Sequence, residues 1–197
     1  DRELNSLLRK KARRLEDANK SAGTTLKELK GRKEAVHAST RGLPEARKLL
    51  LADLDKIQDL ALRVVEQAEA GRVEDATRNQ AMVGELEQKL DERVRLIPIA
   101  LKAVTRSRKQ LKAKRNEVNA RPDAHWDGPE SALKDIDHCM SLANRAQSEI
   151  TRGRPDTVEP VALERCADSV ETALLFADGR YVMYTRVIPI GSLSLLL

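Results

Sequence analysis

The sequence predicts an all-α protein, an elongated antiparallel multi-helix bundle whose long helices pack as coiled-coil hairpins. Composition and spacing lead to this class. Charged residues make up 34% of the 197 residues and aromatic residues only 2%, a profile typical of long helices and coiled coils. Apolar residues amount to 41% and recur with alternating spacings of four and three, which argues against a disordered chain.

The first helix is predicted from the N-terminus to Val36. Seven of the ten positions on its seam, the line of 4-3 spaced positions along one face, are apolar, as expected for a long helix packed on a partner. Residues 37–43 are expected to form a turn, because Gly42 and Pro44 interrupt helical structure. The seam positions are Leu4, Leu8, Lys11, Leu15, Ala18, Ala22, Thr25, Leu29, Arg32 and Val36.

A second helix is expected from Pro44, since proline suits the first helical position, to a stop signal at Gly71. Only Arg47 interrupts the apolar character of its seam. The seam positions are Leu43, Arg47, Leu50, Leu54, Ile57, Ala61, Val64 and Ala68.

The third and longest helix is predicted over residues 73–118, with Pro98 in its interior. Proline removes a backbone hydrogen bond and clashes with the preceding turn, so the alternatives are one kinked helix or two helices. The seam keeps its phase across Pro98 and Ile97 is a poor N-cap, which favours a kinked, continuous helix. The seam positions are Ala76, Gln80, Val83, Glu87, Leu90, Val94, Ile97, Leu101, Val104, Arg108, Leu111, Arg115 and Val118.

A polar loop over residues 119–128 precedes two shorter helices, which are expected to form an αα-hairpin. Residues 181–197 carry one charge and begin with strand-like residues, so an extended apolar tail is predicted there. The expected organisation is therefore a long-helix region (1–121), a hairpin (122–180) and the tail (181–197). The seams of the two short helices contain Leu133, Ile136, Met140, Ala143, Gln147 and Ile150, then Leu163, Ala167, Val170, Leu174 and Ala177.

Charge alternates in blocks along the chain. Residues 1–48 carry 14 basic and 7 acidic residues, residues 49–96 carry 7 and 11, residues 97–121 carry 8 and 1, and residues 122–197 carry 7 and 12. The favoured interpretation is that basic and acidic segments face each other in the fold, as charged positions beside a seam do.

The alternative is that the basic blocks bind an anionic surface. Phosphates of nucleic acid or of a membrane would attract such clusters. A membrane fits better than nucleic acid, because aromatic side chains that could stack on bases are almost lacking near these blocks. The candidate anion contacts are Arg9, Lys10, Arg13, Arg14, Arg106, Arg108, Lys109, Lys112, Lys114 and Arg115.

No residue pattern reaches the specificity of a catalytic, cofactor or metal site. Asp135 and His138 share a helix face, but no second ligand pair has matching spacing. Cys139 and Cys166 are expected to be two buried thiols. In a hairpin turning near Asp156 they would be offset by seven residues, about 10 Å along the helix axis, and disulfide geometry tolerates about 7 Å between Cα atoms.

The sequence therefore predicts a non-enzymatic structural, scaffold or adaptor protein without cofactor or metal. It would act through helix–helix contacts, in self-association or with a protein partner in a larger assembly. The alternative is a module that binds an anionic membrane or, less well matched, nucleic acid. A cytoplasmic location is expected, or a membrane-proximal one if the chain continues past Leu197. The abundance of Arg and Ala suggests a GC-rich bacterial gene.

Overall fold

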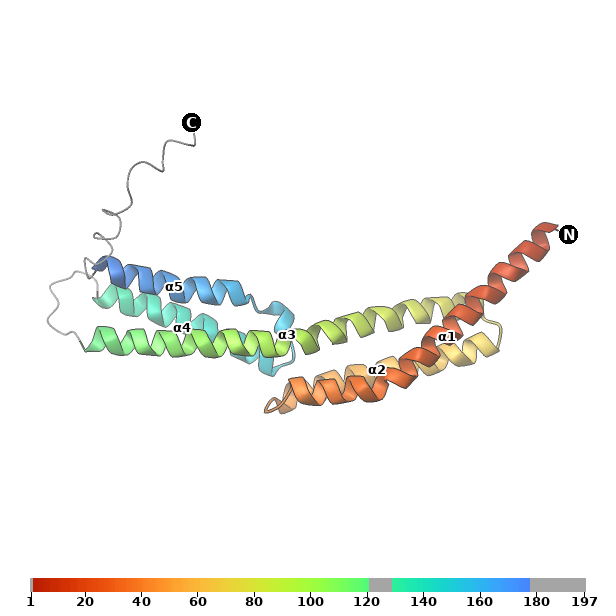
Figure 1. Cartoon of the computed structure of the whole chain (residues 1–197), viewed down its shortest axis with the longest axis horizontal. Helices are drawn as coiled ribbons and strands as arrows, with labels where there is room; N and C mark the ends of the chain where they lie inside the picture. Colours follow the sequence, from red (N-terminus) through yellow and green to blue (C-terminus); the bar gives the residue numbers. More distant parts are fainter. Residues whose placement is uncertain (1, 121–128, 178–197) are drawn as a thin grey trace, which may run out of the picture. The chain divides into compact units, whose positions relative to one another are not determined.

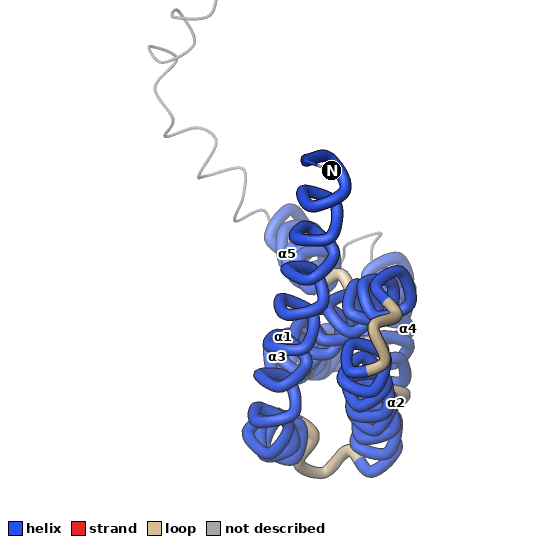
Figure 2. The backbone as a smooth tube through the Cα atoms, turned by 90° about the vertical axis from the view of Figure 1, so that its right-hand side faces the viewer, coloured by secondary structure: helices blue, strands red, loops and turns tan. Residues whose placement is uncertain are grey.

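The computed structural model describes residues 2–120 and 129–177, and this part of the chain is all helical, as predicted. Consecutive helices run antiparallel (Figure 1), and no strand occurs among the described residues (Figure 2). The predicted tail over residues 181–197 and most of the predicted loop over residues 119–128 lie outside the described residues. The helices are α1 (Arg2–Ser39), α2 (Pro44–Glu69), α3 (Val73–Asn119), α4 (Pro129–Thr151) and α5 (Pro160–Ala177), with a short 3₁₀ turn, η1, at Pro155–Thr157.

The helices form two compact units that do not follow the chain in order. Of the described residues, the first unit contains residues 2–98 together with residues 149–156, and the second contains residues 99–120, 129–148 and 157–177. The first unit thus contains α1, α2 and the first half of α3, while the second contains the remainder of α3, most of α4 and α5.

Glycine ends three of the helical segments. Gly42, Gly71 and Gly153 have φ values of 79°, 71° and 75°, a left-handed conformation that glycine adopts without a Cβ clash. Behind Gly71, the amide of Arg72 donates to the carbonyl of Gln67 at 2.8 Å, and behind Gly153 the amide of Arg154 donates to that of Glu149 at 2.9 Å. These are the 6→1 bonds of Schellman caps, so the stop predicted at Gly71 is confirmed.

The core of the first unit follows the predicted seams. Every seam position of α2 is buried or half-buried, and so is every seam position of α1 from Leu15 onward. Side chains of Leu, Ile, Val and Ala supply the fully buried positions, among them Leu50, Ile57 and Val83. Aliphatic side chains therefore take over the burial that aromatic residues provide in many proteins.

Helix α3 continues through Pro98 as a single helix. Its buried face changes there. Up to Ile97, every predicted seam position is buried or half-buried, and Val104, Leu111 and Val118 continue the buried seam beyond Pro98. At the intervening seam positions, however, the buried residue is the one before the predicted residue: Ala100 and Ser107 are buried in place of Leu101 and Arg108. Arg115, which the 4-3 pattern also placed on the seam, is exposed. The apolar stripe thus turns part of the way around the helix.

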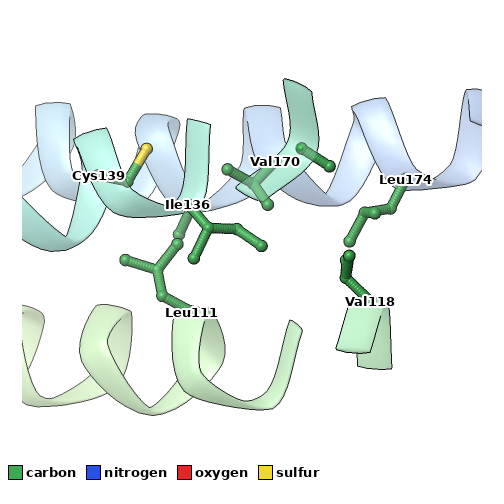
Figure 3. Close-up of a cluster of buried hydrophobic side chains, with 8 residues drawn as sticks. Leu111, Val118, Ile136, Cys139, Val170 and Leu174 are labelled. Carbon is green, nitrogen blue, oxygen red and sulfur yellow. The ribbon is translucent and has the colours of Figure 1, made fainter. Parts of the chain in front are cut away.

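The second unit is held by a cluster of aliphatic side chains between α3, α4 and α5 (Figure 3). Ile136 of α4 is completely buried and points towards Leu111 of α3, and Val170 of α5 is 1% exposed. The cluster consists of Leu111, Val118, Ala132, Ile136, Cys139, Ala167, Val170 and Leu174.

Cys139 and Cys166 form a disulfide between α4 and α5, so the prediction of two separate thiols is wrong. Their Cα atoms lie 5.7 Å apart, within the usual disulfide range. The prediction assumed a simple hairpin with its turn near Asp156, and this assumption does not match the structure. Twelve residues separate Cys139 from the end of α4, but only six separate Cys166 from the start of α5. The segment of residues 152–159 therefore runs back along α4 before α5 begins.

Candidate interaction surface on the first helix

Helix α1 extends past both of its neighbours in the first unit. Because α1 has 38 residues and α2 has 26, the turn between them leaves about 12 residues of α1 without a facing position on α2. The α1–α3 register gives the same limit. Ser21 with Gln80 and Arg32 with Asp91 are each separated by 59 residues, so Val73, the first residue of α3, is level with Arg14. We call residues 2–14 the α1 overhang.

The overhang projects from the N-terminal end of α1, beyond the turn that joins α2 and α3 (Figures 1 and 2). Its length of 13 residues corresponds to about 20 Å at 1.5 Å per residue. Every residue from Glu3 to Arg14 is exposed, whereas Leu15 is half-buried and Ala18 is buried. The boundary in burial therefore coincides with the boundary set by the two registers.

Three leucines of the overhang face solvent. Leu4 is 60% exposed, and Leu7 and Leu8 are each 56% exposed. Leu4 and Leu8 are seam positions, in phase with the buried positions further along α1. Leu7 lies one turn before Lys11 on the same side, since residues three or four apart share a helix face. Leu7 was missed from the sequence because the 4-3 pattern omits it, although its spacing from Leu4 and Lys11 could have revealed it.

The basic residues predicted in this segment surround the leucines. Arg9, Lys10, Arg13 and Arg14 are all exposed, and within the part of the chain that the structure describes none of them forms an ion pair. Lys11, on the seam itself, lies 4.0 Å from the carboxylate of Glu74 in the first turn of α3. The overhang is thus a basic, amphipathic helix end.

The second predicted basic group lies on α3 in the second unit and differs in its contacts. Arg106 lies 4.0 Å from Glu164 of α5, and Arg115 lies 3.2 Å from Asp137 of α4. Lys114 pairs with Glu117 of its own helix at 3.5 Å. Arg108 is half-buried, and Lys109 and Lys112 are exposed. Part of the basic charge on α3 is therefore paired with carboxylates of α4 and α5, whereas Arg9, Lys10, Arg13 and Arg14 of the overhang form no ion pair among the described residues.

Ion pairs in both units connect basic with acidic segments, as the favoured interpretation of the charge blocks predicted. Within the first unit, the acidic partners of the basic helix α1 lie on α3. Arg32 is the strongest example, since its guanidinium contacts Glu87 and Asp91 on α3 as well as Glu28. Burial acts to lower the pKa of Arg32, but Glu87, Asp91 and Glu28 together raise it above its usual value.

The remaining sequence candidates do not converge on a reactive site. Asp135 and His138 are exposed, and Cys139 is bonded to Cys166. Over residues 2–120 and 129–177, no three His, Cys, Asp or Glu side chains are grouped as a metal site would require. In the same ranges, no helix combines the length and hydrophobicity that a bilayer crossing demands.

Comparison of the chain with protein-family models, with curated proteins and with solved structures finds no match.

Proposed function

We propose that this protein is a non-enzymatic scaffold or adaptor that joins other helical proteins through helix–helix contacts. The observation that carries the proposal is the α1 overhang. A rigid helix, anchored by its buried half, presents an apolar seam that α2 and α3 do not reach. Leu4, Leu7 and Leu8 are more than half exposed, and burying such side chains contributes about 1.5–3 kcal/mol each.

The charge arrangement supports the same function. In both units, basic helix surfaces are matched by acidic ones through ion pairs such as Arg32–Glu87 and Arg115–Asp137. Charges at such positions select partner and orientation in helix packing. An exposed basic seam is therefore suited to a specific helical partner, in a larger assembly or in a second copy of the chain.

Chemical crosslinking of the full chain in extracts of its source cells tests this proposal. We expect the amines of Lys10 and Lys11 to crosslink to another polypeptide, because they lie on the overhang. Lys56, an exposed lysine on α2, serves as an internal control and should give far fewer intermolecular crosslinks. Light scattering should show an oligomer or a complex. A monomer without intermolecular crosslinks would refute the scaffold function.

A second candidate function is binding to an anionic surface through the basic helix segments. The exposure of Arg9, Lys10, Arg13 and Arg14 favours it. Co-sedimentation with anionic vesicles or DNA should then fall steeply with salt. The double variant Lys112→Glu with Arg115→Glu tests the α3 group in particular, and unchanged binding in this variant would exclude that group from the contact.

The disulfide bears on the compartment in which the protein works. A cytoplasmic location was expected from the sequence, yet disulfides persist mainly in oxidising compartments and are rare where glutathione keeps thiols reduced. The Cys139–Cys166 bond therefore favours an oxidising compartment. Acid-quenched thiol labelling of protein taken directly from cells checks this, since a labelled pair would support the cytoplasm.

A further inference from the structure

The seam of α1 continues from its buried part into the overhang without a change of phase. Ala18, Ala22 and Val36 lie on the buried part of the seam, and the same 4-3 spacing leads to Leu8 and Leu4. The last contact of the seam within the chain is Lys11 with Glu74, a basic group against an acidic one. The overhang therefore extends an existing helix-packing interface beyond the residues that form it.

Charge restricts what can pack on this extension. Residues 2–14 include six basic residues and one acidic residue, so two copies of the overhang would repel each other when side by side. Like charges that face each other across a helix pair destabilise it, and opposite charges determine the choice of partner. A second overhang is accordingly a poor occupant, and an acidic helix is a good one.

The second unit of the same chain shows how such a helix is covered. Residues 99–118 of α3 include seven basic residues and one acidic residue, much like the overhang. The helices packed on them are acidic: α4 carries two basic and four acidic residues, and α5 carries one and three. Arg106, just before the buried Ser107 on the seam, reaches Glu164. Lys10 has the equivalent place just before Lys11.

The apolar stripe of the overhang also suits a helix better than a membrane. Leu4, Leu7, Leu8 and Lys11 share one face, and the lysine lies within the stripe. Interfacial helices bury a continuous apolar face in the lipid and keep lysines on the opposite face. Lys11 paired with Glu74 instead follows the pattern of Arg32, a basic seam residue matched by acidic side chains of a neighbouring helix.

We propose that the α1 overhang is the docking site for acidic amphipathic helices of another protein, which cover Leu4 and Leu8 as α4 and α5 cover the second half of α3. This inference rests on the proposed scaffold function and specifies its partner. The partner helices carry an aliphatic 4-3 seam flanked by Asp or Glu. They extend from Arg14 towards the N-terminus of α1.

The test uses the full chain and two synthetic helical hairpins with the same leucine and isoleucine seam. One hairpin has glutamate at all flanking positions, and the other has lysine there. Binding is measured by calorimetry or fluorescence anisotropy, and hydrogen exchange locates the contact. We expect the glutamate hairpin to bind at least about tenfold more tightly than the lysine hairpin, to bind less tightly as salt is added, and to slow exchange in residues 2–14.

Two leucine variants connect the binding to the proposed surface. Leu4→Ser with Leu8→Ser should weaken binding of the glutamate hairpin at least about tenfold. Both leucines are more than half exposed, so this variant should keep the unfolding transition of the parent chain. Leu62→Ser is the matched control, because Leu62 is 44% exposed on α2 and lies outside the overhang. The control should bind as the parent chain does.

The possible failures differ in what they overturn. If both hairpins bind equally well and the binding depends on Leu4 and Leu8, the proposal of an acidic partner is wrong, and the scaffold function is still supported. Binding that ignores Leu4 and Leu8 would refute the overhang as the site. If neither hairpin binds and the chain associates with phosphatidylserine vesicles through the same leucines, both the acidic helix and the scaffold function are wrong.

Discussion

At the scale of single residues, the first unit depends on a few positions where charge or backbone geometry is demanding. Arg32 is the best connected of the charged side chains described. It contacts Glu28, Glu87 and Asp91, and its side chain and that of Glu87 are each only 18% exposed. Among the glycines that the structure describes, Gly153 is the most constrained, since an added Cβ would lie 3.0 Å from Leu49.

Arg32→Ala should lower the free energy of unfolding by about 1–2 kcal/mol, because it leaves the half-buried Glu87 without its cation. Arg63→Ala, which removes an exposed arginine of α2, should change it by less than about 0.5 kcal/mol. Urea unfolding measures both. The raised pKa of Arg32 means that the stabilisation by its guanidinium is complete below the usual arginine pKa and is lost only in strongly alkaline solution. The difference in free energy of unfolding between the parent chain and Arg32→Ala should therefore stay constant up to mildly alkaline pH, over the range in which the carboxylates of Glu87 and Asp91 are ionised.

Two glycine-to-alanine changes should act in opposite directions. Gly153→Ala forces a Cβ into a left-handed backbone and against Leu49 and Ala46, and should destabilise the protein by at least about 1–2 kcal/mol. Gly23 lies inside α1 with nothing within 4 Å of an added Cβ, so Gly23→Ala should stabilise it by about 0.5–1 kcal/mol. Thermal unfolding of the two variants compares them, and a shift in the same direction would contradict this account.

At the scale of elements, the spacing of apolar residues and the proline and glycine residues that start or end helices were sufficient to predict the helices. The stop at Gly71, the start at Pro44 and the seam of α2 follow from local physical rules, because burial of one face imposes a helical period on the sequence. Two features depended on the tertiary arrangement instead. The disulfide was missed because the path of residues 152–159 determines the register of α4 and α5. The rotation of the stripe on α3 was missed because the packing partners change along that helix.

The sequence predicts the exposed basic residues of the candidate site but not its exposed leucines. The exposure of Arg9 and Arg13 follows from their places off the seam. The exposure of Leu4 and Leu8 does not, because the seam pattern predicts burial wherever it occurs. Only the register of α1 against α2 and α3 shows that these leucines have no facing residues.

The disulfide should stabilise the second unit measurably. It closes a loop of 27 residues, for which chain entropy gives about 3.5 kcal/mol. We expect dithiothreitol to lower the melting temperature of the parent chain. The double variant Cys139→Ser with Cys166→Ser should melt at a similarly lowered temperature with or without the reductant. An unchanged melting temperature on reduction would show that packing around Cys139 and Ile136 holds α4 and α5 without the bond.

At the scale of the whole molecule, charge is abundant but contributes little to stability through most of its pairs. The side chains of Lys11 and Glu74 are 58% and 78% exposed, and those of Arg115 and Asp137 are 47% and 55% exposed. Solvent and salt screen such pairs strongly. Stability therefore comes mainly from the aliphatic seams, and the exposed charges contribute to the selection of partners.

Salt should consequently have little effect on folding. Raising sodium chloride from about 0.05 M to about 1 M should change the free energy of unfolding in urea by less than about 1 kcal/mol. Binding of an acidic partner to the overhang should weaken over the same range. A loss of several kcal/mol of stability at high salt would mean that the ion pairs hold the fold.

The closeness of Gly153 to Ala46 has a consequence for the order in which the protein is made. These residues are 107 positions apart, and both belong to the first unit. The ribosome must therefore synthesise α3 and α4 before the last segment of that unit exists. Until residue 156 has left the exit tunnel, the part of α2 around Ala46 and Leu49 lacks this neighbour, and apolar surface that is exposed on a nascent chain is what chaperones bind.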